Sequence, residues 1–120
     1  MTDTITLAPP EKRPKIVCFC GSSRFVAEMA VLMWEWTKAG HITFGLQLLP
    51  QWYPGVQPDH QAEAEGLAAA MDELHLRKID LADEIVVVNI GGYIGESTRR
   101  EIAYAESHGK PIRYIEQRED

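Results

Sequence analysis

The sequence predicts an α/β domain of three layers, in which helices cover both faces of a parallel β-sheet of about four strands. Residues 84–90 contain a β-branched run without alternation, Ile85–Val88, a pattern typical of a parallel strand that is buried on both sides. Strand-like and helix-like segments alternate along the chain as β-α-β-α-β-α-β, which requires right-handed crossover connections. The expected strand order is 2-1-3-4, the Rossmann-like or flavodoxin-like arrangement.

Four segments are expected to form the strands: residues 15–20, 42–49, 84–90 and 112–115. Three others have the pattern of helices: residues 25–39, 61–82 and 98–108. Gly40 and Gly109 follow the first and third helices as expected C-caps, and Pro111 prevents any continuation. Apolar positions recur along one side of the second helix, at Leu67, Met71 and Leu74.

The length of 120 residues and the apolar fraction of 45% predict one globular domain. We expect residues 1–14 to form a flexible tail, residues 15–117 the α/β domain, and residues 118–120 a charged end. A net charge of -6 without a basic run argues against duplex nucleic acid as a partner. Because no hydrophobic run approaches a membrane span and no signal-peptide core is present, we expect a cytoplasmic protein without a membrane partner.

Cys18 and Cys20 lie two residues apart in an expected strand, so their side chains share one face and cannot form a disulfide with each other. Buried, reduced thiols are favoured over a metal site, because a metal ion would need further ligands nearby. We therefore expect neither a metal nor a cofactor.

The segment Gly21, Ser22, Ser23 and Arg24 joins the first strand to the first helix and could bind an anion. Backbone N–H groups at a helix N-terminus point outward at the positive end of the dipole, and serine and arginine side chains add hydrogen bonds to a phosphate. An ordinary turn with a serine N-cap is an equally good interpretation. The spacing matches neither a P-loop nor a dinucleotide-binding fingerprint.

A second polar loop follows the third strand and contains three glycines, Gly91, Gly92 and Gly95. Glycine permits backbone conformations that are closed to residues with side chains. With strand order 2-1-3-4, this loop and the Gly21 loop meet where the strand order reverses, which is where ligands bind in such sheets. The candidate site residues in this loop are Asn89, Tyr93 and Gly95, with Tyr93 grouped among the catalytic candidates.

Glu101 lies near the start of the third helix, and two roles compete for it. A glutamate that faces the crevice can attack an electrophilic sugar carbon or stabilise an oxocarbenium ion. Thr98-x-x-Glu101 is also a capping box, in which Ser97 or Thr98 caps the helix and Glu101 bonds back to the backbone. Spacing alone favours the capping box.

Three segments of the chain follow one another in a recognisable order. They are Phe19-Cys-Gly-Ser-Ser-Arg24, Lys78-Ile-Asp-Leu-Ala-Asp-Glu-Ile-Val-Val-Val88, and Gly95-Glu-Ser-Thr-Arg-Arg-Glu-Ile-Ala-Tyr-Ala105 running into Gly109-Lys-Pro111. Together they resemble the nucleoside 2-deoxyribosyltransferase-like superfamily, and in particular its nucleoside monophosphate N-glycosidase branch. The resemblance covers residues 15–116, nearly the whole predicted domain.

This resemblance implies that Glu101 is a nucleophile at the anomeric carbon and that the protein cleaves the base–sugar bond of a nucleoside 5′-monophosphate or a nucleoside. It implies no metal, and a homo-oligomer, because relatives build sites across dimers. Burial of Glu101 in the core, away from the Gly21 loop, would contradict this role. The residues implied to hold the 5′-phosphate are Gly21, Ser22, Ser23, Arg24 and Ser97, with Thr98 beside them.

His75 stands where family enzymes usually carry an aspartate that helps the base to leave. Either His75 performs this proton transfer, or the chain has different chemistry or none. One alternative is a non-catalytic nucleotide-binding or sensor module of the same superfamily. Another is the phosphoribohydrolase family that activates cytokinin nucleotides, which has a turn similar to Cys20-Gly-Ser-Ser23.

Overall fold

The computed structural model of the chain describes residues 12–54 and 61–117. The predicted charged end, residues 118–120, and most of the predicted tail, residues 1–11, lie outside the described residues. The elements, with η for a 3-10 helix, are β1 (Ile16–Gly21), η1 (Ser23–Phe25), α1 (Val26–Lys38), β2 (Ile42–Phe44), α2 (Gln61–Ala64), α3 (Ala68–Leu81), β3 (Glu84–Val88), η2 (Ile90–Gly92), α4 (Glu96–Ser107) and β4 (Ile112–Tyr114).

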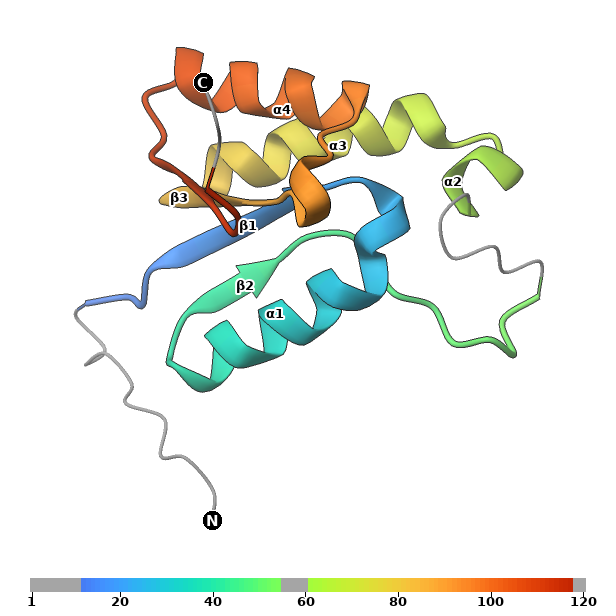
Figure 1. Cartoon of the computed structure of the whole chain (residues 1–120), viewed down its shortest axis with the longest axis horizontal. Helices are drawn as coiled ribbons and strands as arrows, with labels where there is room; N and C mark the ends of the chain where they lie inside the picture. Colours follow the sequence, from blue (N-terminus) through green and yellow to red (C-terminus); the bar gives the residue numbers. More distant parts are fainter. Residues whose placement is uncertain (1–11, 55–60, 118–120) are drawn as a thin grey trace.

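The four strands form one parallel sheet in the order β2-β1-β3-β4, which confirms the predicted fold class and strand order (Figure 1). β1 and β3 are the central pair, with Val17 opposite Glu84 and Gly21 opposite Val88. β3 is buried along its whole length, as the apolar run Ile85–Val88 predicts, and this burial includes its first residue, Glu84. Both central strands therefore end at the same edge of the sheet.

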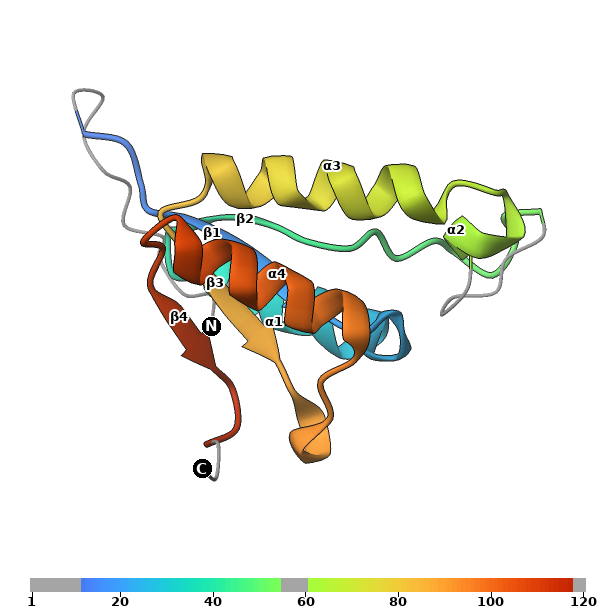
Figure 2. The same cartoon turned by 90° about the horizontal axis from the view of Figure 1, so that it is seen from above.

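Helices cover both faces of this sheet. Figure 1 shows α1 on one side of the strands and α3 and α4 on the other, and Figure 2 shows α3 and α4 side by side. Successive side chains of β1 alternate between these two layers. Val17 and Phe19 pack in the cluster that contains Met29 of α1, whereas Cys18 and Cys20 pack towards α3 and α4.

The predicted long helix over residues 61–82 is broken into α2 and α3 at Gly66, which has a φ of 72°. The apolar side that we expected is also not the inner one, since Leu67, Met71 and Leu74 are all exposed. The buried residues of α3 are instead His75 and Ile79. Because His75 lies on the inner face of α3, the pattern of apolar residues alone does not identify that face.

The chain is fixed to the domain before β1 begins. Arg13 lies within the stretch predicted as a tail, and its guanidinium donates two hydrogen bonds of 2.6 and 2.8 Å to the Asp83 carboxylate. Asp83 also accepts the backbone N–H of Ile16 at 2.8 Å. In the part of the chain that the structure describes, no helix combines the length and hydropathy needed to cross a membrane.

Candidate functional site

The two loops singled out in the sequence lie against each other at the carboxyl edge of the sheet. The Arg24 guanidinium lies 3.8 Å from the centre of the Tyr93 ring, and the Phe25 and Tyr93 ring centres are 6.1 Å apart. These contacts follow from the strand order, which places the ends of β1 and β3 next to each other. The predicted meeting of the loops is therefore present.

The first loop has the features of an ordinary strand–helix turn. The Ser22 hydroxyl accepts the backbone N–H of Arg24 at 3.3 Å and caps the short helix η1. At Gly21, a Cβ atom would come within 3.1 Å of Val88 and 3.2 Å of Met29. Packing between β1 and β3 thus explains this glycine, and Arg24 is the residue of the loop that adds charge.

The second loop is tied to the segment after β4. Gly91 and Gly92 have φ values of 65° and 79°, so the backbone there needs glycine. The Gly91 N–H donates to the Glu116 carboxylate at 3.0 Å. The Asn89 amide donates to the Glu116 carbonyl at 3.1 Å and accepts its N–H at 3.0 Å. Asn89, which was predicted to contact substrate, is buried, and its side-chain amide is hydrogen-bonded to the backbone of Glu116.

Helix α4 begins at Glu96 with Gly95 as its N-cap, two residues before the predicted start. Thr98 is therefore inside the helix, where it is buried, and the Ser97 hydroxyl accepts a hydrogen bond from Arg100 at 3.2 Å. Glu101 lies in the second turn. The predicted Thr98 capping box is wrong, because neither Ser97 nor Thr98 is at the N-cap.

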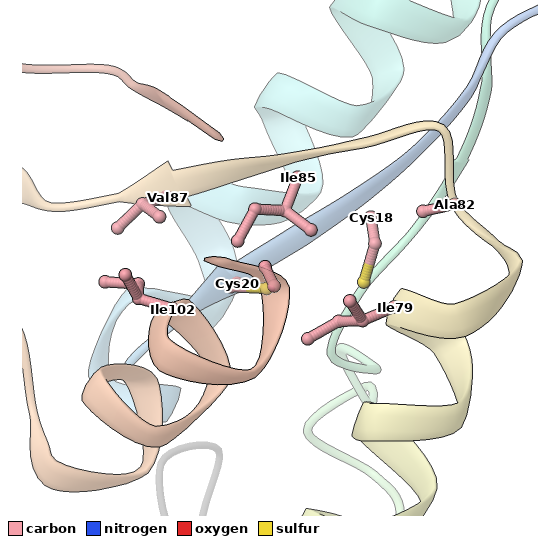
Figure 3. Close-up of a cluster of buried hydrophobic side chains, with 8 residues drawn as sticks. Cys18, Cys20, Ile79, Ala82, Ile85, Val87 and Ile102 are labelled. Atoms are coloured by element: carbon pink, nitrogen blue, oxygen red, sulfur yellow. The ribbon is translucent and has the colours of Figure 1, made fainter. Parts of the chain in front are cut away.

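Glu101 belongs to a buried cluster of four polar side chains, which we call the β1 cluster: Cys18, Cys20, His75 and Glu101. His75 of α3 is at its centre. The His75 Nε2 atom lies 3.6 Å from Cys18 Sγ, 3.3 Å from Cys20 Sγ and 3.7 Å from Glu101 Oε1. Figure 3 shows both sulfur atoms on the side of β1 that faces α3 and α4, near Ile79 and Ile102.

Each ionisable group of the β1 cluster alters the others. Burial raises the pKa of Glu101 to about 7, although the nearby His75 works in the opposite direction. Burial lowers the pKa of His75, but the Cys18 hydrogen bond and the Glu101 charge outweigh it and raise the pKa overall. The hydrogen bond from Cys20 lowers the pKa of the Cys18 thiol to about 6, and the same contact raises the pKa of Cys20.

Burial of Glu101 in the core, away from the Gly21 loop, would contradict a catalytic role. Only the first of these two features is observed. The residue is only 7% exposed, so its carboxylate is in the core. It is not far from the first loop, however, because it interacts with Cys20, the residue directly before Gly21. Glu101 and His75 thus lie beneath the edge where the two loops meet.

The two cysteines are the members of this cluster that the sequence analysis placed in the core without a function. The sequence contained a signal for the cluster: Cys18 and Cys20 lie on one face of β1, and the helix α3 packs on that face. A histidine on the inner side of that helix then meets them, but the periodicity of the helix does not show which side is the inner one. Comparison with family models, curated proteins and solved structures found no match to the chain.

Proposed function

We propose that the protein is an N-glycosidase or N-glycosyltransferase that cleaves the base–sugar bond of a nucleoside 5′-monophosphate or a nucleoside. The observation that carries this proposal is the pairing of Glu101 with His75 at 3.7 Å, next to Cys20, which directly precedes the loop that begins at Gly21. A carboxylate beside an imidazole provides a nucleophile and a proton donor in one place. The phosphate and sugar would approach from the loop edge of the sheet.

In the proposed reaction, a Glu101 oxygen attacks the anomeric carbon and forms an ester bond to the sugar. The bond from that carbon to the base nitrogen breaks, and its electron pair stays with the base. Protonated His75 supplies the proton that the departing base takes up. Water then releases the sugar in hydrolysis, or a second base accepts it in transfer.

For substrate binding, we propose Gly21, Ser22, Ser23 and Arg24 as the phosphate loop. Arg24 can give charge-assisted hydrogen bonds to a phosphate, and the Tyr93 ring beneath it offers an aromatic surface for the base. Ser97 and Gly95 lie at the start of α4 on the same side. Asn89 and Thr98, which were also predicted to bind substrate, are buried, and Asn89 is hydrogen-bonded to Glu116.

Access to Glu101 requires α3 and α4 to separate at this end. Arg100 of α4 joins the two helices through a contact of 3.3 Å to Asp72 of α3, and it forms a second ion pair of 3.3 Å within α4, to Glu96. Both ion pairs are exposed and therefore weak, so a bound nucleotide could displace them. The burial of Glu101 also favours a second candidate, a module of the same superfamily that binds a nucleotide without turnover.

We also propose that the protein is cytoplasmic and forms a homo-oligomer. Large apolar side chains are exposed on α1, where Val31 and Trp34 are 61% and 58% exposed. Such residues are enriched where subunits meet. Small-angle scattering is expected to give the mass of a dimer or a larger assembly, and a monomer at high concentration would contradict this part of the proposal.

The proposed activity is tested by measuring base release. The parent protein and Glu101→Ala are incubated with ribo- and deoxynucleosides and their 5′-monophosphates, and the products are separated by chromatography. We expect free base from the parent alone. If the parent releases no base, with or without a second base as acceptor, but a nucleotide still raises its melting temperature, the binding module replaces the enzyme.

A further inference from the structure

We propose that the β1 cluster is a zinc site, in which Cys18, Cys20, His75 and Glu101 bind one Zn²⁺ ion. The ligand atoms would be both Sγ atoms, His75 Nε2 and one carboxylate oxygen. Structural zinc sites take four such ligands from sulfur, nitrogen and oxygen in a tetrahedron. The cluster supplies four donors from three different elements of the fold, β1, α3 and α4.

The spacing of the Cys18, Cys20 and His75 donors fits a tetrahedral ion. With Zn–S bonds of about 2.3 Å and Zn–N bonds of about 2.0 Å, tetrahedral angles place sulfur and nitrogen about 3.5 Å apart. The observed distances from His75 Nε2 to the two sulfur atoms are 3.3 and 3.6 Å. The three donor atoms of Cys18, Cys20 and His75 all lie within 4.8 Å of one another.

The same groups do not satisfy one another without an ion. A single His75 Nε2 atom faces two sulfur atoms and a carboxylate oxygen, and it can hydrogen-bond them only through one proton or one lone pair. Glu101 Oε1 is buried and has no hydrogen-bond partner. A buried carboxylate oxygen without a hydrogen bond is costly, whereas a metal ion accepts lone pairs from all four groups at once.

The fold brings these donors together on one side of the sheet. In β1, Cys18 and Cys20 point to one face because side chains two residues apart do so. Lys78, one turn after His75, contributes positive charge near the Cys18 thiol, which partly offsets the excess negative charge of two thiolates and a carboxylate on one Zn²⁺. Thiolate, imidazole and carboxylate ligands in a tetrahedral arrangement favour Zn²⁺ over Mg²⁺ or Ca²⁺, which take oxygen ligands.

The zinc site does not rest on the proposed glycosidase activity, and the two uses of the cluster exclude each other. A Glu101 carboxylate bound to zinc cannot attack a sugar, and His75 Nε2 bound to zinc cannot carry a proton. The protein loaded with zinc is therefore expected to release no base, whatever the zinc-free protein does. Metal binding can be measured without any turnover, so failure of one proposal is separate from failure of the other.

The test uses the full chain, refolded under reducing conditions with ZnCl₂ or CoCl₂ and then passed through a desalting column. We expect one retained metal ion per chain and a higher melting temperature than for protein refolded with a chelator. With Co²⁺ we expect a sulfur-to-cobalt charge-transfer band in the near ultraviolet and strong visible bands of a tetrahedral site. Binding should also release protons from the thiols.

Cys18→Ala and Cys20→Ala are each expected to lose the retained metal and the charge-transfer band. Val87→Ala is the matched control, because it removes volume from the same buried layer without removing a donor. It should lose stability and keep the metal. If the cysteine variants do not fold, the cobalt spectrum of the parent still tests whether thiolates bind the metal. A folded parent that retains no zinc, or that binds Co²⁺ without a thiolate band, would overturn the proposal.

Discussion

Glu101 is a carboxylate in the core, and its surroundings explain how the fold tolerates it. Burial favours its protonated form, and His75 offers a partner for the charged form. Nothing in the helix requires a glutamate there, because α4 is capped by Gly95. The chain therefore keeps an ionisable group where an apolar residue would be more stable, which is typical of residues selected for chemistry.

Arg24 is the residue whose role in substrate binding can be separated from folding, since it is exposed. We expect Arg24→Ala to raise KM for a nucleoside 5′-monophosphate about tenfold, the effect of losing one charged hydrogen bond to phosphate. KM for the corresponding nucleoside should stay unchanged. Arg77→Ala removes the same charge from α3 and serves as the control. Equal effects of Arg24→Ala on both substrates would contradict a phosphate contact.

Protonation of Asp83 at low pH is expected to weaken the fold. Hydrogen bonds from Arg13 and the Ile16 N–H hold its pKa well below the usual range. Its contribution to stability is therefore present above the unfolded pKa of about 3.9 and is lost as pH falls through the lower, folded value. We expect Asp83→Asn to lower the melting temperature by about 3 °C at pH 7 and by less below pH 4.

Melting curves from pH 3 to 7 check this dependence. Glu106→Gln removes one negative charge from the exposed surface of α4 and controls for the change in net charge. A difference between parent and Asp83→Asn that stays constant down to pH 3 would show that the Arg13 contact does not set the acid behaviour.

At the scale of elements, the loop after β3 depends on backbone geometry that only glycine adopts cheaply. Gly91 has a φ of 65°, and a Cβ atom there would have no neighbouring atom within 4 Å. A side chain would therefore strain the backbone without clashing with other residues. We expect Gly91→Ala to destabilise the fold by about 1 kcal/mol. Gly91→Asn should cost less, because asparagine tolerates this conformation. Denaturant titrations measure both, and equal costs would contradict strain as the cause.

The elements also show what the sequence can and cannot predict. The order of strands and helices was predictable, because four of the five residues of β3 form the apolar run Ile85–Val88, and Gly40 and Gly109 end their helices as expected. The inner face of α3 was not, because it is set by contacts to β1 cysteines that are distant in sequence. The start of α4 was missed because an extended glycine, without a side-chain bond, caps it.

At the scale of the whole molecule, one edge of the sheet brings the two candidate loops together. The strand order alone was enough to predict that the Gly21 and Gly91 loops would meet there. The strand order was not enough to predict that the Asn89 amide is hydrogen-bonded to the Glu116 backbone. It also did not predict that two thiols contact His75 beside Glu101. Those pairings depend on side-chain packing between layers, which chain order and periodicity do not specify.

The most direct measurement is the rate of base release by zinc-free Glu101→Gln compared with the parent, on the best substrate of the panel. Glu96→Gln, an exposed glutamate on the same helix, is the control. We expect Glu101→Gln to lose at least about 100-fold in rate while staying folded, and Glu96→Gln to keep parental activity. A Glu101→Gln variant that releases base as fast as the parent would contradict the proposed role of this carboxylate.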